Sequence, residues 1–179
     1  MCSSTASGSR IRLATGQDAD AIARIHTASW QAGYRGVMPS ELLDGLRWQD
    51  RAERWRTILA NQRPGESTLI VALDDRDVGF CSVGPTREDH PALTDTFELY
   101  AIYLLPEAWG TDLGTALLTA SLERVPAQAP AVTLWVLADN PRARGFYERH
   151  GFALDGATKS EDFGGRALEE VRYRLPRHA

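Results

Sequence analysis

One stretch of this chain decides its fold: Leu134-Trp-Val-Leu-Ala-Asp-Asn-Pro-Arg-Ala-Arg-Gly-Phe-Tyr-Glu-Arg-His-Gly-Phe152. Its first residues continue a largely apolar run that starts at Val132 and predicts a strand. Asn140 before Pro141 predicts a helix start, because Asn caps the first N–H groups and Pro fits the first helical position. The short helix is expected to end at Gly151, since Gly adopts the left-handed conformation that closes a helix. These residues therefore predict a strand, a turn and a helix in succession.

A second strand–turn–helix precedes it. The β-prone run Thr94–Leu105 is followed by Pro106-Glu-Ala-Trp-Gly-Thr-Asp-Leu-Gly114, and apolar residues then return at helical spacing over Leu113–Leu122. Gly110 and Gly114 allow a backbone to approach a ligand closely. A helix start also presents unpaired N–H groups with a partial positive charge, which suits a pyrophosphate. The glycines alone do not separate this site from an ordinary strand-to-helix connection.

The rest of the chain predicts a mixture of helices and strands without repeats or a linker. The expected elements are a strand at Ile11–Leu13, a capping box at Thr15–Asp18 opening a helix to about Trp30, a helical stretch from Pro39 to about Leu59, a hairpin of Thr68–Leu73 and Val78–Val83, and a last pair at Phe152–Ser160 and Leu168–Leu175. We therefore expect a flexible tail at residues 1–9 and one α/β domain over residues 10–179.

Composition excludes several classes of function. The chain has 179 residues with a formal net charge of −4, so a nucleic-acid partner held through its phosphates is not expected. An apolar run long enough to span a bilayer and a secretory signal are both lacking, which favours a cytoplasmic protein without a membrane partner. Cys2 and Cys81 form no disulfide framework, and no metal site is expected because the four histidines show no ligand spacing: His26, His90, His150 and His178.

Together the two motifs resemble the signatures of the GNAT superfamily of N-acetyltransferases, over about residues 10–175. In the second motif Asn140, Ala143, Phe146, Tyr147, Gly151 and Phe152 have the family spacing. In the first, the family loop Arg/Gln-x-x-Gly-x-Gly/Ala is similar to Trp109–Gly114, where Gly110, Leu113 and Gly114 match. Trp109 replaces the usual Arg or Gln, Thr111 stands where Arg or Lys is frequent, and Asp112 stands where Gly is expected. A carboxylate at Asp112 would repel a pyrophosphate unless it points outward or caps the helix.

The resemblance implies a fold of the α/β (α+β) type, a mixed, mostly antiparallel twisted sheet whose central parallel strands splay apart, with flanking helices. It implies an acetyl-CoA-dependent N-acetyltransferase that transfers an acetyl group directly to a primary amine of a small molecule or a peptide. Family members often dimerise, and a homodimer stays open here. The cofactor-binding residues that it implies are the backbone of Ile102, Tyr103 and Leu104, the loop and helix start Trp109, Gly110, Thr111, Asp112, Leu113, Gly114 and Thr115, and finally Asn140 and Tyr147.

Two catalytic residues follow from the resemblance. Tyr147 is the expected general acid for the thiolate, because a phenol with a pKa of about 10 can share a proton with a departing thiol. Glu98 is the expected base, acting through water; on a regular strand it faces the same way as Ile102 and Leu104, unless a bulge reverses it. In isolation, Tyr147 also fits a core aromatic and Glu98 an exposed strand-end residue.

The acceptor pocket is expected from the N-terminal helices, with Trp30 and Tyr34 as walls, although Trp30 also fits simple helix packing. His26 is expected to be structural and Cys81 an inert core residue. Two other functions stay open: a non-catalytic acyl-CoA-binding domain, favoured by Trp109 and Asp112, and a purely structural interaction domain. The sequence does not name the acceptor, since one fold serves many acceptors.

Overall fold

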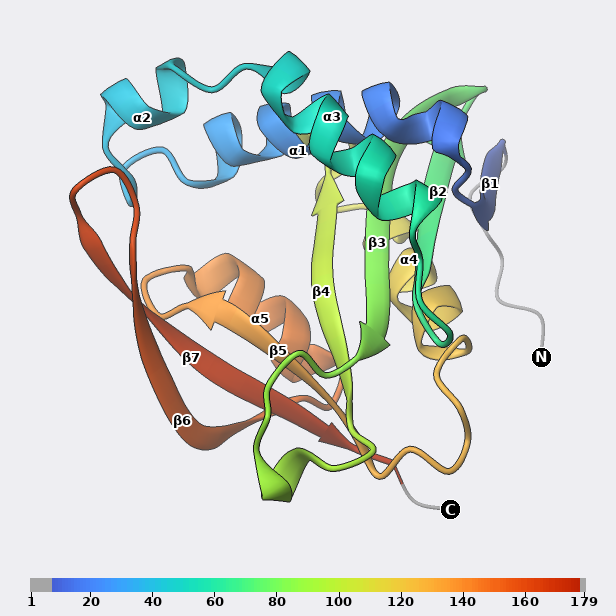
Figure 1. The fold of residues 1–179 in the computed structure, drawn as a ribbon. Coiled ribbons are helices and arrows are strands. Elements are labelled where there is room, and N and C mark those ends of the chain that lie inside the picture. The colour runs from blue at the N-terminus through green and yellow to red at the C-terminus, as the bar shows by residue number, and fades with distance from the viewer. Residues whose placement is uncertain (1–7, 178–179) are drawn as a thin grey trace.

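The computed structural model describes residues 8–177 and contains a seven-stranded sheet (Figure 1). Along the sheet the order is β1-β2-β3-β4-β5-β7-β6. The strands are β1 Ser9–Leu13, β2 Ser67–Leu73, β3 Arg76–Pro85, β4 Phe97–Leu104, β5 Ala131–Leu137, β6 Ala153–Asp162 and β7 Ala167–Pro176. Cys2 and His178 lie outside the described residues, as does most of the predicted tail, of which Ser9 already belongs to β1.

Every neighbouring pair in the sheet is antiparallel except β4 and β5, which run parallel at its centre. These two strands pair only at Phe97 with Val132 and at Glu98 with Thr133. Beyond these pairs they diverge, as Figure 1 shows. The predicted fold class, a mostly antiparallel sheet with splayed central parallel strands, is confirmed.

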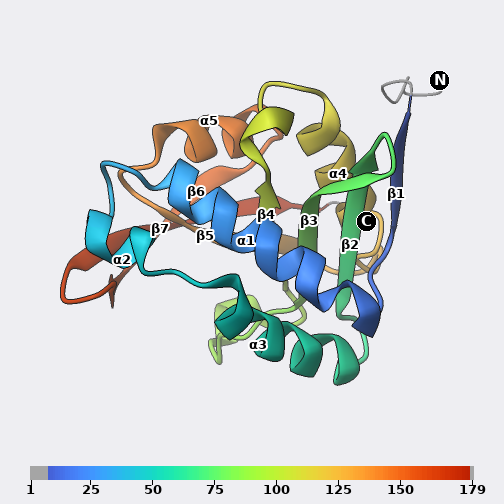
Figure 2. The ribbon, with the colours of Figure 1, turned by 90° about the horizontal axis from the view of Figure 1, so that it is seen from above.

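Helices cover both faces of the sheet (Figure 2). On one face lie α1 (Ala19–Gly33) and α3 (Trp48–Ala60), and on the other α4 (Leu113–Leu122) and α5 (Pro141–Arg149). The first face is packed by aromatic contacts such as Trp55 on Phe80, whose ring centroids are 5.0 Å apart. On the second face α4 buries Leu117 and Leu118 almost completely. A short α2 (Ser40–Asp44) links α1 to α3.

The predicted capping box is present, because the side chains of Thr15 and Asp18 bond each other's backbone N–H groups at the start of α1. The predicted helical stretch from Pro39 to Leu59 is instead two helices, since Gly45 closes α2 by donating its N–H to Glu41 O. β4 starts at Phe97 rather than Thr94, because Asp95 adopts a left-handed φ of 58° that strand pairing does not allow.

Within residues 8–177, none of the helices combines the length and the apolar character that crossing a membrane requires. Over the same residues, no group of three or more His, Cys, Asp or Glu side chains is placed to hold a metal ion.

Candidate active site

Where β4 and β5 diverge, Leu99–Leu104 of β4 and Leu134–Leu137 of β5 no longer pair with each other. We call the opening between these two strand segments the fork. Leu105 N–H donates to Val78 O on the β3 side. Because backbone groups alternate along a strand, those of Ile102 and Leu104 turn toward the fork and those of Tyr103 toward β3. Of the three predicted backbone contacts, the geometry therefore favours Ile102 and Leu104.

The Leu104 carbonyl already has two side-chain donors. Ser29 Oγ of α1 donates to Leu104 O at 2.8 Å, and Trp109 Nε1 donates to the same oxygen at 2.8 Å. A carbonyl oxygen has two lone pairs, so this acceptor is saturated. Trp109, which replaces the usual Arg or Gln of the family loop, therefore anchors that loop to the end of β4.

The loop from Trp109 to Gly114 has the conformation that the two glycines predict. Gly110 has a φ of +73°, and a Cβ placed there would meet no atom within 4 Å, so the backbone faces open space. Gly114 is buried, and a Cβ there would lie 3.4 Å from the Phe146 ring. The first glycine thus permits the turn, and the second permits α4 to approach α5 closely.

The same loop leads into the N-terminus of α4, which begins at Leu113. Thr111 Oγ1 donates to Ala108 O at 2.7 Å and accepts from Leu113 N–H at 3.4 Å. The N–H groups of Gly114 and Thr115 belong to the first turn, where a helix has no carbonyl of its own to bond. Asp112 is exposed, and its side chain makes no capping hydrogen bond. Its carboxylate therefore points outward, which removes most of the predicted repulsion of a phosphate.

A cation from α5 supplements this loop. The Arg142 guanidinium stacks over the Trp109 ring, with its central carbon 3.4 Å from the ring centroid. Arg142 has no ion-pair partner among residues 8–177, and burial lowers the pKa of its guanidinium. Asn140 caps α5, since its Oδ1 accepts from Ala143 N–H at 3.1 Å. Two helix N-termini, an open glycine turn and one cation thus meet beside the fork, a donor set that fits a pyrophosphate.

Tyr147 lies on α5, the helix that follows β5, and is 8% exposed. Its ring contacts Phe146 and Phe152, with centroids 5.5 and 5.9 Å away. Burial raises the pKa of Tyr147 well above the ordinary value, and the nearby Tyr103 phenol and Cys81 thiol raise it further. Because of this raised pKa the hydroxyl stays protonated, and it makes no hydrogen bond to any residue between Gly8 and Arg177, so its proton is available to another acceptor.

Glu98 lies on a different face from the one that regular alternation predicts. The register between β3 and β4 skips Tyr100, so β4 has a bulge there. Glu98 is opposite Gly84 and Tyr103 opposite Phe80, so both face α1 and α3, whereas Ile102 and Leu104 face α4. The plain-alternation expectation that Glu98 shares a face with Ile102 and Leu104 is therefore wrong, and the bulge is the reason.

The Glu98 carboxylate is 2% exposed and is bound by Arg87 through both the backbone N–H and the guanidinium. Glu88 follows Arg87 in the loop between β3 and β4. Its carboxylate accepts from Trp135 Nε1 at 2.9 Å and from Arg172 at 2.8 Å. This loop therefore ties β4 to β5 and β7 across the closed end of the fork. Glu98 has a structural role as its anchor, whatever its role in catalysis.

An aromatic cluster lies on the α1 side of β4. Tyr103 stacks on His26, with ring centroids 4.8 Å apart, and Trp30 packs edge-on against Tyr34 at 5.2 Å. Burial raises the pKa of Tyr34 well above the ordinary value, with the Tyr103 phenol adding to it. Phe163, from the loop between β6 and β7, lies 6.0 Å from Trp30. The two predicted acceptor walls thus lie together on the face opposite Leu104, beside the ring of Tyr103.

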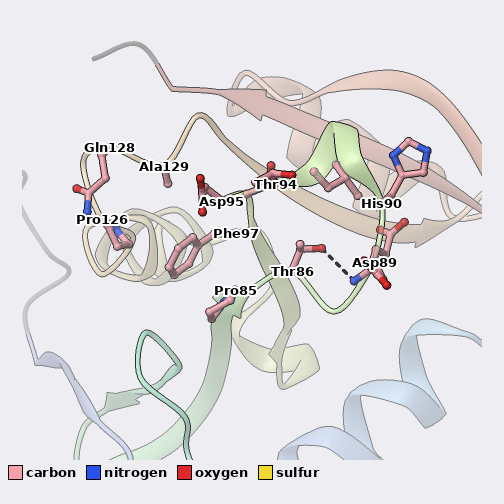
Figure 3. A pocket seen from close by; sticks show the side chains of 13 residues that line it. Pro85, Thr86, Asp89, His90, Thr94, Asp95, Phe97, Pro126, Gln128 and Ala129 are labelled. Carbon is pink, nitrogen blue, oxygen red and sulfur yellow. Dashed lines mark hydrogen bonds between the residues drawn. The ribbon is translucent and has the colours of Figure 1, made fainter.

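A separate cavity of about 600 Å³ lies at the other end of β4 (Figure 3). It is lined by the β3–β4 connection and by residues before β5, including Thr86, Asp89, Phe97 and Gln128. None of the residues predicted for cofactor, acid, base or acceptor lines it. It is therefore distinct from the fork.

Sequence reasoning missed three arginines near the site: Arg51, Arg87 and Arg142. Arg142 lies within the quoted motif, two residues after Asn140. Because the glycine loop lacks the usual cation, a cation from another segment could have been expected there. Arg51 lies on α3 and Arg87 in the β3–β4 loop, and nothing in local sequence relates either of them to β4.

Comparison with known proteins agrees with this geometry. The family model of the acetyltransferase (GNAT) family matches residues 20–152. A Mycobacterium tuberculosis protein whose name reads "probable N-acetyltransferase" is 30% identical over 175 residues, which cover 95% of each chain. PaiA N-acetyltransferase from Thermoplasma acidophilum, solved with coenzyme A, superposes with a TM-score of 0.71 at 20% identity, over 94% of this chain and 98% of that one.

YncA from Salmonella typhimurium, solved with its cofactor acetyl-CoA, gives a TM-score of 0.70 at 18% identity, over 96% of this chain and 95% of that one. The structural likenesses support the fold, and the family model and the mycobacterial relative support the activity class. The chain belongs to the GNAT family and is an N-acetyltransferase.

Proposed function

We propose that this enzyme transfers the acetyl group of acetyl-CoA directly to the primary amine of a small molecule or a peptide. The observation that carries the proposal is the environment of Tyr147: a largely buried ring on the helix that follows β5, close to the Tyr103 phenol of β4, with a hydroxyl that makes no hydrogen bond within residues 8–177. A group-transfer enzyme needs a proton donor there, and a merely structural tyrosine would be expected to use its hydroxyl in the core.

Bound acetyl-CoA would supply the activated acetyl thioester. The backbone of Ile102 and the N–H of Leu104 would hold its extended arm along the open edge of β4. The N–H groups of Gly114 and Thr115, with the turn at Gly110, would bind its pyrophosphate. Arg142 would add the positive charge that Trp109 and Thr111 do not provide.

Tyr147 would donate its proton to the thiolate as the thiol leaves. Its raised pKa keeps the proton on the oxygen at neutral pH. Transfer to a thiolate, whose conjugate acid has a pKa of about 8.5, is then uphill in the resting protein. Desolvation raises the proton affinity of a thiolate as well, so burial of the departing sulfur in the fork would reduce this difference.

Glu98 is retained as the proposed base, acting through water. The bulge at Tyr100 supports this role, because it turns Glu98 to the face that carries Trp30 and Tyr34. Its contacts with Arg87 oppose it, since both the backbone N–H and the guanidinium of Arg87 already bind this carboxylate. Replacing Glu98 by Gln and, separately, Arg87 by Gln distinguishes the two roles. If Glu98 is the base, E98Q should lower kcat far more than R87Q does; if it is only an anchor, both variants should lose stability alike and change kcat equally little.

The test of the proposed function is thiol release from acetyl-CoA with a panel of primary amines, together with calorimetric titration of acetyl-CoA. The proposal expects saturable binding and amine-dependent thiol release. Saturable binding without release by any amine would instead support the non-catalytic acyl-CoA-binding alternative.

A further inference from the structure

One strongly basic group near the fork has no acidic partner. Arg51 lies on α3, half-buried, and its guanidinium carbon is 4.5 Å from the centroid of the Trp30 ring. It forms no ion pair with any Asp or Glu between Gly8 and Arg177, and its buried Nε has no hydrogen-bond partner there. Burial is the largest cause of a lowered pKa for Arg51; the nearby Tyr103 phenol opposes it and the neighbouring Arg54 adds to it.

The neighbours of Arg51 are also donors. His26 Nδ1 accepts from Trp55 Nε1 at 3.3 Å, and His26 Nε2 lies 3.4 Å from Arg51 Nη1. Burial, followed by the charges of Arg51 and Arg54, lowers the pKa of His26 to about 3, so the ring is neutral. A neutral imidazole has one acceptor nitrogen, so it cannot accept from both Trp55 and Arg51. At least one N–H at this point therefore lacks an acceptor.

Trp30 adds another buried donor. Its Nε1 is buried and has no partner of hydrogen-bond geometry among the described residues, although the Tyr103 phenol is close enough for this N–H to oppose the rise of the Tyr103 pKa; the ring lies against Arg51. Donors from Arg51 and His26 thus lie together, with the Trp30 ring against Arg51 and further aromatic rings around them. Such a set is costly to bury and is satisfied best by one anion with several lone pairs. The nearby carboxylate of Glu170, which raises the pKa of both Tyr34 and Tyr103, is already paired with Lys159 at 3.1 Å.

The donors lie on the acceptor side of the reaction. His26 stacks on Tyr103, and Tyr103 is close enough to Tyr147 for its phenol to raise the pKa of that residue. Tyr103 therefore contacts the cluster around Arg51 through His26 and is also near the proposed proton donor. An acceptor amine that reaches the acetyl group near Tyr147 would have the rest of its body near Arg51.

We propose that the acceptor is a small primary amine that also carries a carboxylate, and that Arg51 binds this carboxylate. The inference rests on the proposed acetyl transfer and names its substrate class. The planar guanidinium suits a carboxylate because two of its N–H groups match two carboxylate oxygens. In this arrangement Arg51 determines specificity, and the indole of Trp30 and the imidazole of His26 position its guanidinium.

The experiment compares matched acceptors on the wild-type enzyme: free amino acids, the same amino acids as carboxamides, and the corresponding decarboxylated amines. Thiol release should favour the free acids by roughly 10- to 100-fold in kcat/KM, the range expected for one charge-assisted hydrogen-bonded pair. Equal rates for the three sets, or a preference for carboxamides or decarboxylated amines, would overturn the inference while leaving acetyl transfer intact. Thiol release by none of these amines would also overturn the inference, and if peptide amines likewise gave no release, acetyl transfer would be overturned as well.

Variants make the assignment specific. Arg51→Gln should remove the preference for free acids and leave acetyl-CoA affinity, measured by calorimetry, unchanged. Arg51→Lys should keep part of the preference, because it keeps the charge but not the paired geometry. Arg54→Gln, which removes the same charge from an exposed position one turn along α3, is the matched control and should change neither. A preference that survives in R51Q, or disappears equally in R54Q, would contradict the role of Arg51.

Discussion

Replacement of Tyr147 by Phe separates chemistry from packing. The change removes only the hydroxyl, which makes no hydrogen bond within the described chain, and leaves a ring that packs on Phe146 and Phe152. The free energy of unfolding should therefore change by less than about 1 kcal/mol, because no hydrogen bond between described residues is lost. Turnover should fall about 100-fold, the lower end for loss of a general acid, which corresponds to about 2.7 kcal/mol in the barrier.

Tyr173→Phe is the matched control. The Tyr173 hydroxyl donates to Glu148 at 2.6 Å and accepts from Arg144 at 3.0 Å, outside the fork. Its loss should lower the free energy of unfolding by roughly 1 to 2 kcal/mol and leave turnover nearly unchanged. Y147F is thus expected to lose turnover and keep its stability, whereas Y173F is expected to lose stability and keep its turnover.

The assay is single-turnover thiol release, with the enzyme in excess over acetyl-CoA and the amine saturating, together with urea unfolding of the same samples. Because burial raises the pKa of Tyr147, the wild-type rate should show no decline from its ionisation at any pH below about 10. A Y147F rate within about threefold of the wild type, under conditions where chemistry is limiting, would refute the assignment of Tyr147 as the acid.

Three further predictions follow from other contacts. Arg142→Gln should weaken acetyl-CoA binding roughly three- to tenfold by calorimetry, less at high salt, and an unchanged Kd would exclude a phosphate contact. In a Cys2→Ser variant the remaining Cys81 should react with iodoacetamide at pH 8 at least about 100-fold more slowly than glutathione, because burial raises its pKa to about 12; rapid labelling would contradict that burial. Asp18 has its pKa lowered to about 2 by Arg12, below the unfolded value, so this pair stabilises the fold above about pH 4 and less as pH falls toward 2. Asp18→Asn should therefore cost roughly 1 kcal/mol in urea unfolding at pH 7 and little near pH 2, and an equal cost at both would argue against the ion pair.

Much of the fold was predictable from local sequence. The capping box at Thr15 and the Asn140-Pro141 helix start depend on residues within one turn, so their signals are contained in a few letters. The turn at Gly110 is similar, because a left-handed φ next to a helix start favours glycine. The splayed central strands were implied by the family resemblance rather than by the residues themselves.

The rest depends on contacts between distant segments. The bulge at Tyr100 is set by the register against β3, and it decides which face Glu98 occupies. The Arg142–Trp109 stack joins α5 to a loop more than 30 residues earlier, as their numbers show. Arg51 becomes notable only when α3 packs against α1, which places it over Trp30 with no carboxylate of the described chain to accompany it. Spacing along the sequence carries no signal for such pairs.

The most direct test of acetyl transfer by this fork uses acetyl-CoA labelled in its acetyl group, incubated with the wild-type enzyme and a panel of amino acids. The label should appear as an amide on the acceptor nitrogen, at a rate that falls about 100-fold in Y147F while acetyl-CoA binding persists. Saturable binding of acetyl-CoA with no label on any amine, or equal labelling by Y147F, would contradict the account.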